Sequence, residues 1–119
     1  MSIASKLQIK PGQSASVIGK PDAVVLDLGA GIASADDPLA ADALVVFCND
    51  RAELEQRKDP LLAAASRDAL TWVAYPKAGQ LGTDLNRDSV ASLVSADGVR
   101  PVRQVSIDEV WSALRLRPA

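Results

Sequence analysis

The chain has 119 residues, of which 48% are hydrophobic and 24% charged, and its formal net charge is −2 at pH 7. These values are ordinary for one folded domain, and they exclude a disordered, collagen-like or coiled-coil chain. The acidic balance gives none of the overall positive charge of nucleic-acid-binding domains. No run approaches the ~20 apolar residues of a membrane span, and residues 1–12 lack a signal-peptide core. We therefore expect one cytoplasmic domain without membrane association.

Histidine is absent and Cys48 is the only cysteine. Without imidazole the chain can form neither a Ser-His-Asp or Cys-His catalytic group nor a zinc site that uses histidine. A single cysteine also excludes an internal disulfide and a CxxC redox pair. Because Cys48 ends the apolar run 44–48, we expect a buried and unreactive thiol. The few, scattered aromatic residues argue against stacking of bases, so we expect no nucleic-acid partner.

The N-terminal part predicts one helical turn at residues 2–7 and a short buried strand at residues 14–18 that ends at Gly19. The Pro11-Gly12 pair turns the chain between them. Residues 30–42 are small and acidic, and predict loops with a short strand near Ile32.

Residues 23–28 are ambiguous. Their β-branched, apolar composition favours a strand. Pro21 before them and Gly29 after them are helix start and stop signals, and a helix would place Val24, Val25 and Leu28 on one face. We expect a short helix here.

The apolar run 43–48 predicts a strand of a parallel sheet that is covered on both faces. Asp50 and Glu53 have the spacing of a capping box, so a helix is expected from about residue 51 to 58. Pro60 suits the first turn of a helix, and it predicts a second helix that starts anew there.

The C-terminal part predicts a strand at residues 69–75, a helix capped by Thr83 or Asp84, and a strand at residues 99–107. Gly98 ends that helix. Residues 110–116 alternate apolar and polar side chains, which favours a strand. Ser106 and Glu109 form a capping box, which favours a helix. We expect the strand.

Strands that alternate with helices pair in parallel, whereas two strands joined only by residues 108–109 can pair only antiparallel. We therefore predict an α/β fold. It consists of a single Rossmann-like, mainly parallel sheet flanked by helices and ending in an antiparallel β-hairpin.

The pattern LxIKPG at residues 7–12, followed by a short strand ending in Gly19, is similar to the start of S-adenosylmethionine-dependent methyltransferase domains. The resemblance implies a cofactor over the turn after that strand. Here the turn reads Gly19-Lys20-Pro21-Asp22, with one glycine and an intruding proline, so we expect no cofactor. The VLDLGAG run at residues 25–31 looks like the methyltransferase glycine motif, but too little chain follows it for the required helix and strand.

The whole chain resembles a bacterial family of small Rossmann-like domains of unknown function. The matching segments are KLQIKPG (6–12), DRAEL (50–54), TWVAYPK (71–77), TDLN (83–86) and residues 105–116 with their DEVWS motif. The resemblance implies a Rossmann-like fold with a short helix after Gly19, and it implies no activity.

Ligands of open α/β sheets bind beyond the carboxyl ends of the parallel strands. Lys77 is the only cation directly at a predicted strand end, and Asp84 lies a short loop away. Lys77 and Asp84 are therefore candidate ligand contacts, of which Lys77 would bind an anionic group and Asp84 would orient it. The alternative is a surface lysine and a helix N-cap. Asp50, at the end of another strand, is a further candidate contact. Trp111 is either the wall of a ligand pocket or an aromatic residue of the core or of a dimer contact.

Charge and apolar surface near the C-terminus predict a partner. Arginines outnumber acids from residue 99 onward and suit an acidic protein partner, or else they form a solvated face. The apolar hairpin residues exceed what one edge strand needs, which predicts a homodimer through the hairpin and Trp111. We expect a non-catalytic interaction or regulatory protein. The alternative is a small cofactor- or nucleotide-binding protein of methyltransferase ancestry.

Overall fold

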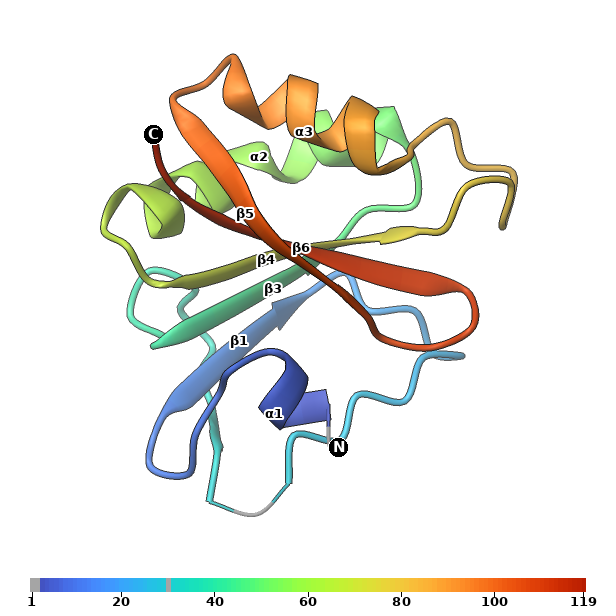
Figure 1. Ribbon diagram of the computed structural model, residues 1–119. Coiled ribbons are helices and arrows are strands. Elements are labelled where there is room, and N and C mark those ends of the chain that lie inside the picture. The colour runs from blue at the N-terminus through green and yellow to red at the C-terminus, as the bar shows by residue number, and fades with distance from the viewer. Residues whose placement is uncertain (1–2, 30) are drawn as a thin grey trace.

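The computed structural model describes residues 3–29 and 31–119, which surround one six-stranded sheet with the order β2-β1-β3-β4-β6-β5 (Figure 1). The strands are β1 (Ser14–Ile18), β2 (Ala33–Ser34), β3 (Ala43–Phe47), β4 (Leu70–Pro76), β5 (Val99–Ser106) and β6 (Trp111–Pro118). The helices are α1 (Ile3–Lys6), α2 (Arg51–Ser66) and α3 (Arg87–Ser95). Strands β2, β1, β3 and β4 pair in parallel, and β6 is antiparallel to β4 and β5. The predicted α/β class with a C-terminal antiparallel hairpin is confirmed.

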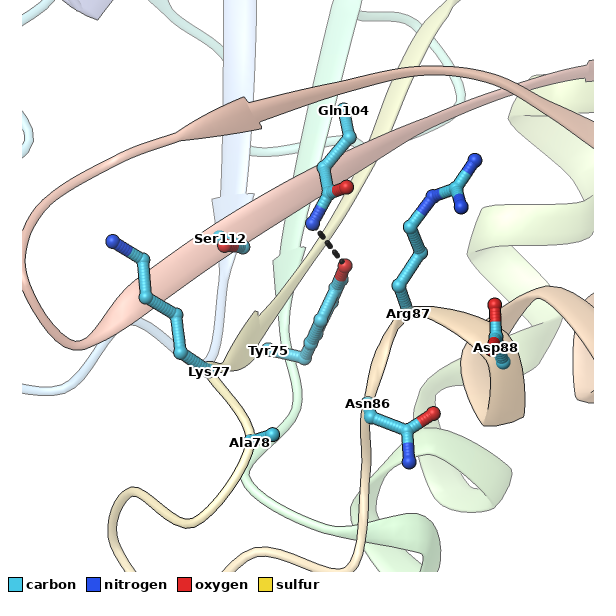
Figure 2. Close-up of a pocket in the computed structure, with 8 residues that line it drawn as sticks. All are labelled: Tyr75, Lys77, Ala78, Asn86, Arg87, Asp88, Gln104 and Ser112. Atoms are coloured by element: carbon cyan, nitrogen blue, oxygen red, sulfur yellow. Dashed lines mark hydrogen bonds between the residues drawn. The ribbon is translucent and has the colours of Figure 1, made fainter.

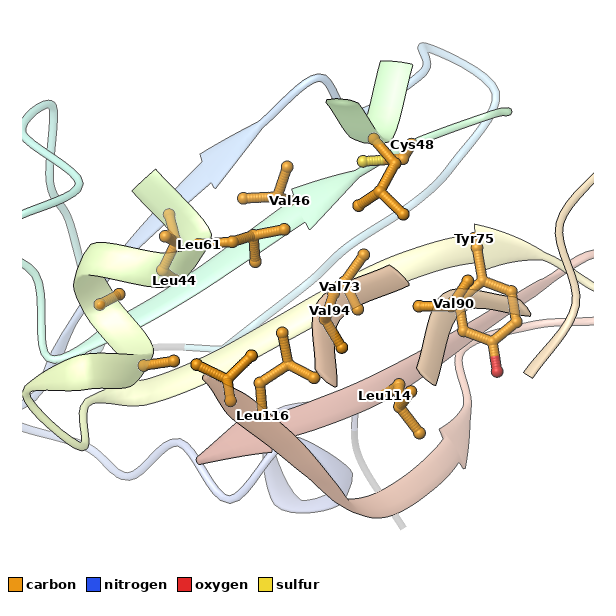
Figure 3. Packing of buried hydrophobic residues seen from close by; sticks show 14 of the residues in the cluster. Leu44, Val46, Cys48, Leu61, Val73, Tyr75, Val90, Val94, Leu114 and Leu116 are labelled. Atoms are coloured by element: carbon orange, nitrogen blue, oxygen red, sulfur yellow. The ribbon is translucent and has the colours of Figure 1, made fainter. Parts of the chain in front are cut away.

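Apolar residues cover the sheet on both faces. Helices α2 and α3 lie over one face, where Leu54, Leu61 and Val90 pack on the strands (Figure 3). The N-terminal segment with α1 lies on the opposite side of the sheet, where Leu7 packs near Trp72 (Figure 1). Strand β3 is buried along its whole length because it is covered from both sides, which explains its unbroken apolar run.

The predicted helix at residues 23–28 is wrong, and so is the short helix that the family resemblance implied after Gly19. The segment has one turn, in which Val24 N–H donates to Pro21 O at 3.0 Å, and then runs without helix or strand. Val24 is buried while Val25 is 80% exposed, and Leu26 and Leu28 pack against the core. This alternation is that of an extended chain, which turns every second apolar side chain toward the sheet.

The predicted break before Pro60 is wrong as well, because α2 continues through it. Proline removes one helical hydrogen bond, yet Leu54, Leu61 and Ala65 lie at helical spacing on one buried face. Burial of that face offsets the lost bond. The start of α2 at Arg51 agrees with the prediction from Asp50.

The cap of α3 differs from the prediction of Thr83 or Asp84. The Asn86 side chain accepts a hydrogen bond from Ser89 N–H, and the Ser89 hydroxyl accepts one from Asn86 N–H, both at 2.9 Å. This reciprocal pair is a capping box.

The prediction of a strand at residues 110–116 is confirmed by β6, which lies between β4 and β5. Its side chains alternate, so that Trp111 and Ala113 join one core cluster while Leu114 and Leu116 join the other. The capping-box spacing of Ser106 and Glu109 does not start a helix. The chain turns there instead, because Asp108 Oδ1 accepts hydrogen bonds from the N–H groups of Val110 and Trp111. Among the described residues, no helix is long and apolar enough to cross a membrane.

Candidate functional site

The residues that the sequence singled out do not form one site. Asp50 and Asp84 meet at the start of α2, where Asp50 Oδ1 accepts a hydrogen bond from Glu53 N–H at 2.9 Å. Asp84 Oδ1 accepts one from Arg51 N–H at 2.8 Å. Both carboxylates therefore cap the first turn of α2. Asp84, one of the two caps predicted for α3, caps α2 instead.

Trp111 is only 3% exposed and packs edge-to-face on Phe47, with ring centroids 5.3 Å apart. It belongs to the core of the sheet, which is one of its two predicted roles, and it lies outside the three pockets described for residues 3–29 and 31–119. Of the residues predicted to contact a ligand, Lys77 alone lines one of the pockets found in the described part of the chain.

That pocket lies beyond the carboxyl end of β4, between the start of α3 and the β5–β6 hairpin, and has a volume of about 370 Å³ (Figure 2). Its lining residues are Tyr75, Lys77, Ala78, Asn86, Arg87, Asp88, Gln104 and Ser112. We call it the β4 pocket. All but Ala78 carry a polar group, so the pocket offers several hydrogen-bonding groups to a ligand.

Hydroxyl groups from two paired strands face the β4 pocket. Tyr75 in β4 and Ser112 in β6 are register partners. The Tyr75 hydroxyl accepts a hydrogen bond from Gln104 Nε2 at 3.1 Å (Figure 2). Burial raises the pKa of Tyr75, although Arg87 and Gln104 act in the opposite direction, so the phenol stays protonated at neutral pH. Its proton has no hydrogen-bond acceptor among the described residues and is available to a ligand.

Two cations flank the Tyr75–Gln104 pair. Lys77 Nζ donates to Ser106 Oγ at 2.9 Å, and Lys77 N–H donates to Val110 O at 2.7 Å, which hold this residue toward the hairpin. The side chain of Arg87, the first residue of α3, makes no hydrogen bond or ion pair with another described residue. Figure 2 shows Lys77 and Arg87 on opposite sides of the Tyr75–Gln104 hydrogen bond. Asp88, next to Arg87, supplies one opposing charge.

Sequence reasoning missed most of the pocket. Tyr75, Arg87, Gln104 and Ser112 come from separate elements, and only the tertiary fold brings them together. One signal was available: Ser112 is a polar residue between the apolar residues Trp111 and Ala113.

A second region lies at the carboxyl ends of β1 and β3, where the strand order reverses and where open, mainly parallel α/β sheets usually bind ligands. Here the Arg57 guanidinium of α2 donates hydrogen bonds to Phe47 O and to Glu53 Oε1. A Cβ atom on Gly19 would lie 2.4 Å from Arg57 Nη1. The glycine therefore makes room for the chain's own arginine.

The prediction that Cys48 is buried is confirmed, since the residue is 0% exposed. Burial raises the pKa of its thiol to about 12. The charge of Arg57 acts in the opposite direction, and the charges of Glu53 and Asp50 raise the pKa by smaller amounts. The reactive form of cysteine is the thiolate, which this environment strongly disfavours. The thiol therefore acts as a small apolar core group.

In comparisons with known proteins, no family model matches the chain and no curated protein matches it. The described residues, 3–29 and 31–119, hold no group of three or more histidine, cysteine or carboxylate side chains that could bind a metal ion.

Proposed function

We propose that this protein is a non-catalytic interaction or regulatory domain that binds an anionic ligand in the β4 pocket. The observation that carries the proposal is the set of hydrogen-bond donors around that pocket. The Lys77 ammonium, the Arg87 guanidinium and the Tyr75 hydroxyl all border it, against the single carboxylate of Asp88. Two positive charges and one negative charge leave a positive pocket in a chain whose overall charge is negative.

The surroundings of Asp50, Asp84 and Tyr75 support binding rather than catalysis. General acid–base chemistry needs a titrating group that is free to exchange a proton with the substrate. Asp50 and Asp84 already accept backbone hydrogen bonds, and the Tyr75 phenol is held in its protonated form by burial. The β4 pocket therefore offers donors that hold an anion.

The alternative is a cofactor- or nucleotide-binding protein of methyltransferase ancestry. It would need the region at the carboxyl ends of β1 and β3, where Arg57 packs against Gly19 and hydrogen-bonds to Phe47 O. This contact favours the β4 pocket over that region as the ligand site.

A thermal-shift screen followed by calorimetry tests the proposed function. The ligands are inorganic phosphate, small mono- and dicarboxylic acids, S-adenosylmethionine and common nucleotides. We expect at least one small anion to stabilise the protein, by about 2.7 kcal/mol at 100 times its Kd. Lys77→Met or Arg87→Gln should weaken that binding about 10-fold, the loss of one charge-assisted hydrogen bond. S-adenosylmethionine should give no shift at sub-millimolar concentration.

Lys10→Met and Arg51→Gln are the matched controls, because both side chains are exposed and lie outside the β4 pocket. They should leave the binding unchanged. If no small anion binds, or if the controls weaken binding as much as the pocket variants do, the proposed function is wrong. Sub-millimolar binding of S-adenosylmethionine would revive the alternative.

The homodimer through the hairpin stays a prediction, with a changed set of contacts. Trp111 is buried inside the chain and cannot contact a second copy. The dimer contact would then be the edge strand β5, where Val102 is 39% exposed. Pro101 lacks a backbone N–H, and a register irregularity follows it, both of which are features that guard sheet edges. If β5 pairs with a second copy, sedimentation equilibrium should give twice 12.5 kDa, and Val102→Asp should halve the mass. A mass of 12.5 kDa at micromolar concentration would exclude the dimer.

A further inference from the structure

The two cations of the β4 pocket are held apart by the fold. Lys77 follows β4 and is bonded to Ser106 Oγ, whose own hydroxyl donates to Asp108 O at 3.0 Å, so its ammonium is tied to the hairpin. Arg87 begins α3 on the other side of Tyr75 (Figure 2). Because the two cations lie on opposite sides of the Tyr75–Gln104 pair (Figure 2), a ligand with two anionic groups can use both of them.

Both cations keep donors free for a ligand. An ammonium has three N–H donors, and Lys77 uses one of them on Ser106. The Arg87 guanidinium uses none on the described residues, and its planar fork matches the two oxygens of a carboxylate. Each end of the pocket can therefore bind one carboxylate.

The space between the cations offers neutral donors. The Tyr75 proton is unused, and the Ser112 hydroxyl makes no hydrogen bond with another described residue while it lines the pocket. A ligand oxygen midway between two carboxylates, such as a hydroxyl or keto group, would accept hydrogen bonds there.

The lining argues against larger ligands. Ala78 is its only residue without a polar side chain, and Tyr75 is its only aromatic residue. A nucleotide base binds best between aromatic rings, and the lining offers it only Tyr75. A small open-chain polar molecule fits a volume of about 370 Å³ with such walls.

From this arrangement, and resting on the proposed function, we infer that the ligand is a small dicarboxylate. One carboxylate binds Lys77, the other binds Arg87, and a central oxygen faces Tyr75 and Ser112. Asp88 lowers the affinity by repelling the carboxylate at the Arg87 end.

Calorimetry with small anions that carry two, one or no carboxylates tests this inference. The probes are malate, succinate, lactate and inorganic phosphate. We expect malate to bind at least 10-fold more tightly than lactate, which carries the same hydroxyl but one carboxylate fewer. Lys77→Met and Arg87→Gln should each remove most of the advantage of malate over lactate. Asp88→Asn should tighten malate binding a few-fold, and Arg51→Gln should leave it unchanged.

The outcomes separate the two proposals. If lactate or phosphate binds as tightly as malate and depends on only one of the two cations, the inference fails while the proposed function survives. If none of the probes binds, and no other small anion does, both fail. The comparison of malate with lactate uses the wild-type chain, so it decides the inference even where a variant does not fold.

Discussion

Trp72→Ala is expected to lower the free energy of unfolding by about 3–5 kcal/mol, the usual range for deleting a buried tryptophan. Trp72 is 0% exposed and lies in the core on the side of the sheet that the N-terminal segment covers. Its indole Nε1 donates to Leu7 O at 3.0 Å, a buried bond between residues 65 positions apart. The substitution thus leaves a cavity and leaves Leu7 O without its hydrogen-bond donor. Urea denaturation followed by circular dichroism measures the loss.

A pair of phenylalanine substitutions separates packing from hydrogen bonding. Trp72→Phe keeps most of the ring and leaves Leu7 O without its donor, at a cost of about 1–3 kcal/mol. Trp111→Phe is the control, since Trp111 is also buried but has no comparable indole bond to a described residue. Trp72→Phe should therefore be the more destabilising of the two. Equal losses would mean that the bond to Leu7 does not hold the N-terminal segment.

Gly19→Ala is expected to lower the free energy of unfolding by about 3 kcal/mol, which is well above the effect of an ordinary glycine substitution. Gly19 has a φ of +72°, a conformation that costs other residues roughly 1–2 kcal/mol. The added Cβ would also lie 2.4 Å from Arg57 Nη1 and 3.0 Å from Phe47 O. Arg57 must then move and give up its hydrogen bond to Phe47 O, which adds about 1.5–3 kcal/mol. Chemical denaturation of both proteins gives the difference.

Gly79→Ala provides the matched control. Gly79 has a similar φ of +82°, but a Cβ atom there would meet no atom within 4 Å. Gly79→Ala should lower the free energy of unfolding only by the penalty for a positive φ. In an Arg57→Ala background, the cost of Gly19→Ala should fall toward that of Gly79→Ala, since the side chain that it displaces is gone. Identical costs for the two glycines in the native background would show that Gly19 does not serve to accommodate Arg57.

The sequence alone determined the elements whose signals are local. Strands β1, β3 and β4 follow from short apolar runs, two of them bounded by glycine or proline, and the start of α2 follows from the capping spacing after Asp50. The C-terminal hairpin follows from two strands joined by a connection too short for a parallel crossover. Lys77, at the end of β4, could be predicted as a ligand contact because ligands usually bind at the carboxyl ends of parallel strands.

Only the tertiary structure decided the path of residues 23–28, the length of α2 and the composition of the β4 pocket. Residues 23–28 have no strand partner within the described chain, so packing against the sheet, rather than propensity, sets their extended path. Helix α2 continues through Pro60 because its buried face outweighs one lost hydrogen bond. The β4 pocket depends on the register that places Tyr75 opposite Ser112, and on the side of the sheet where α3 begins with Arg87. These are long-range contacts, and no pattern along the chain encodes the distance between residues that meet only when the sheet is assembled.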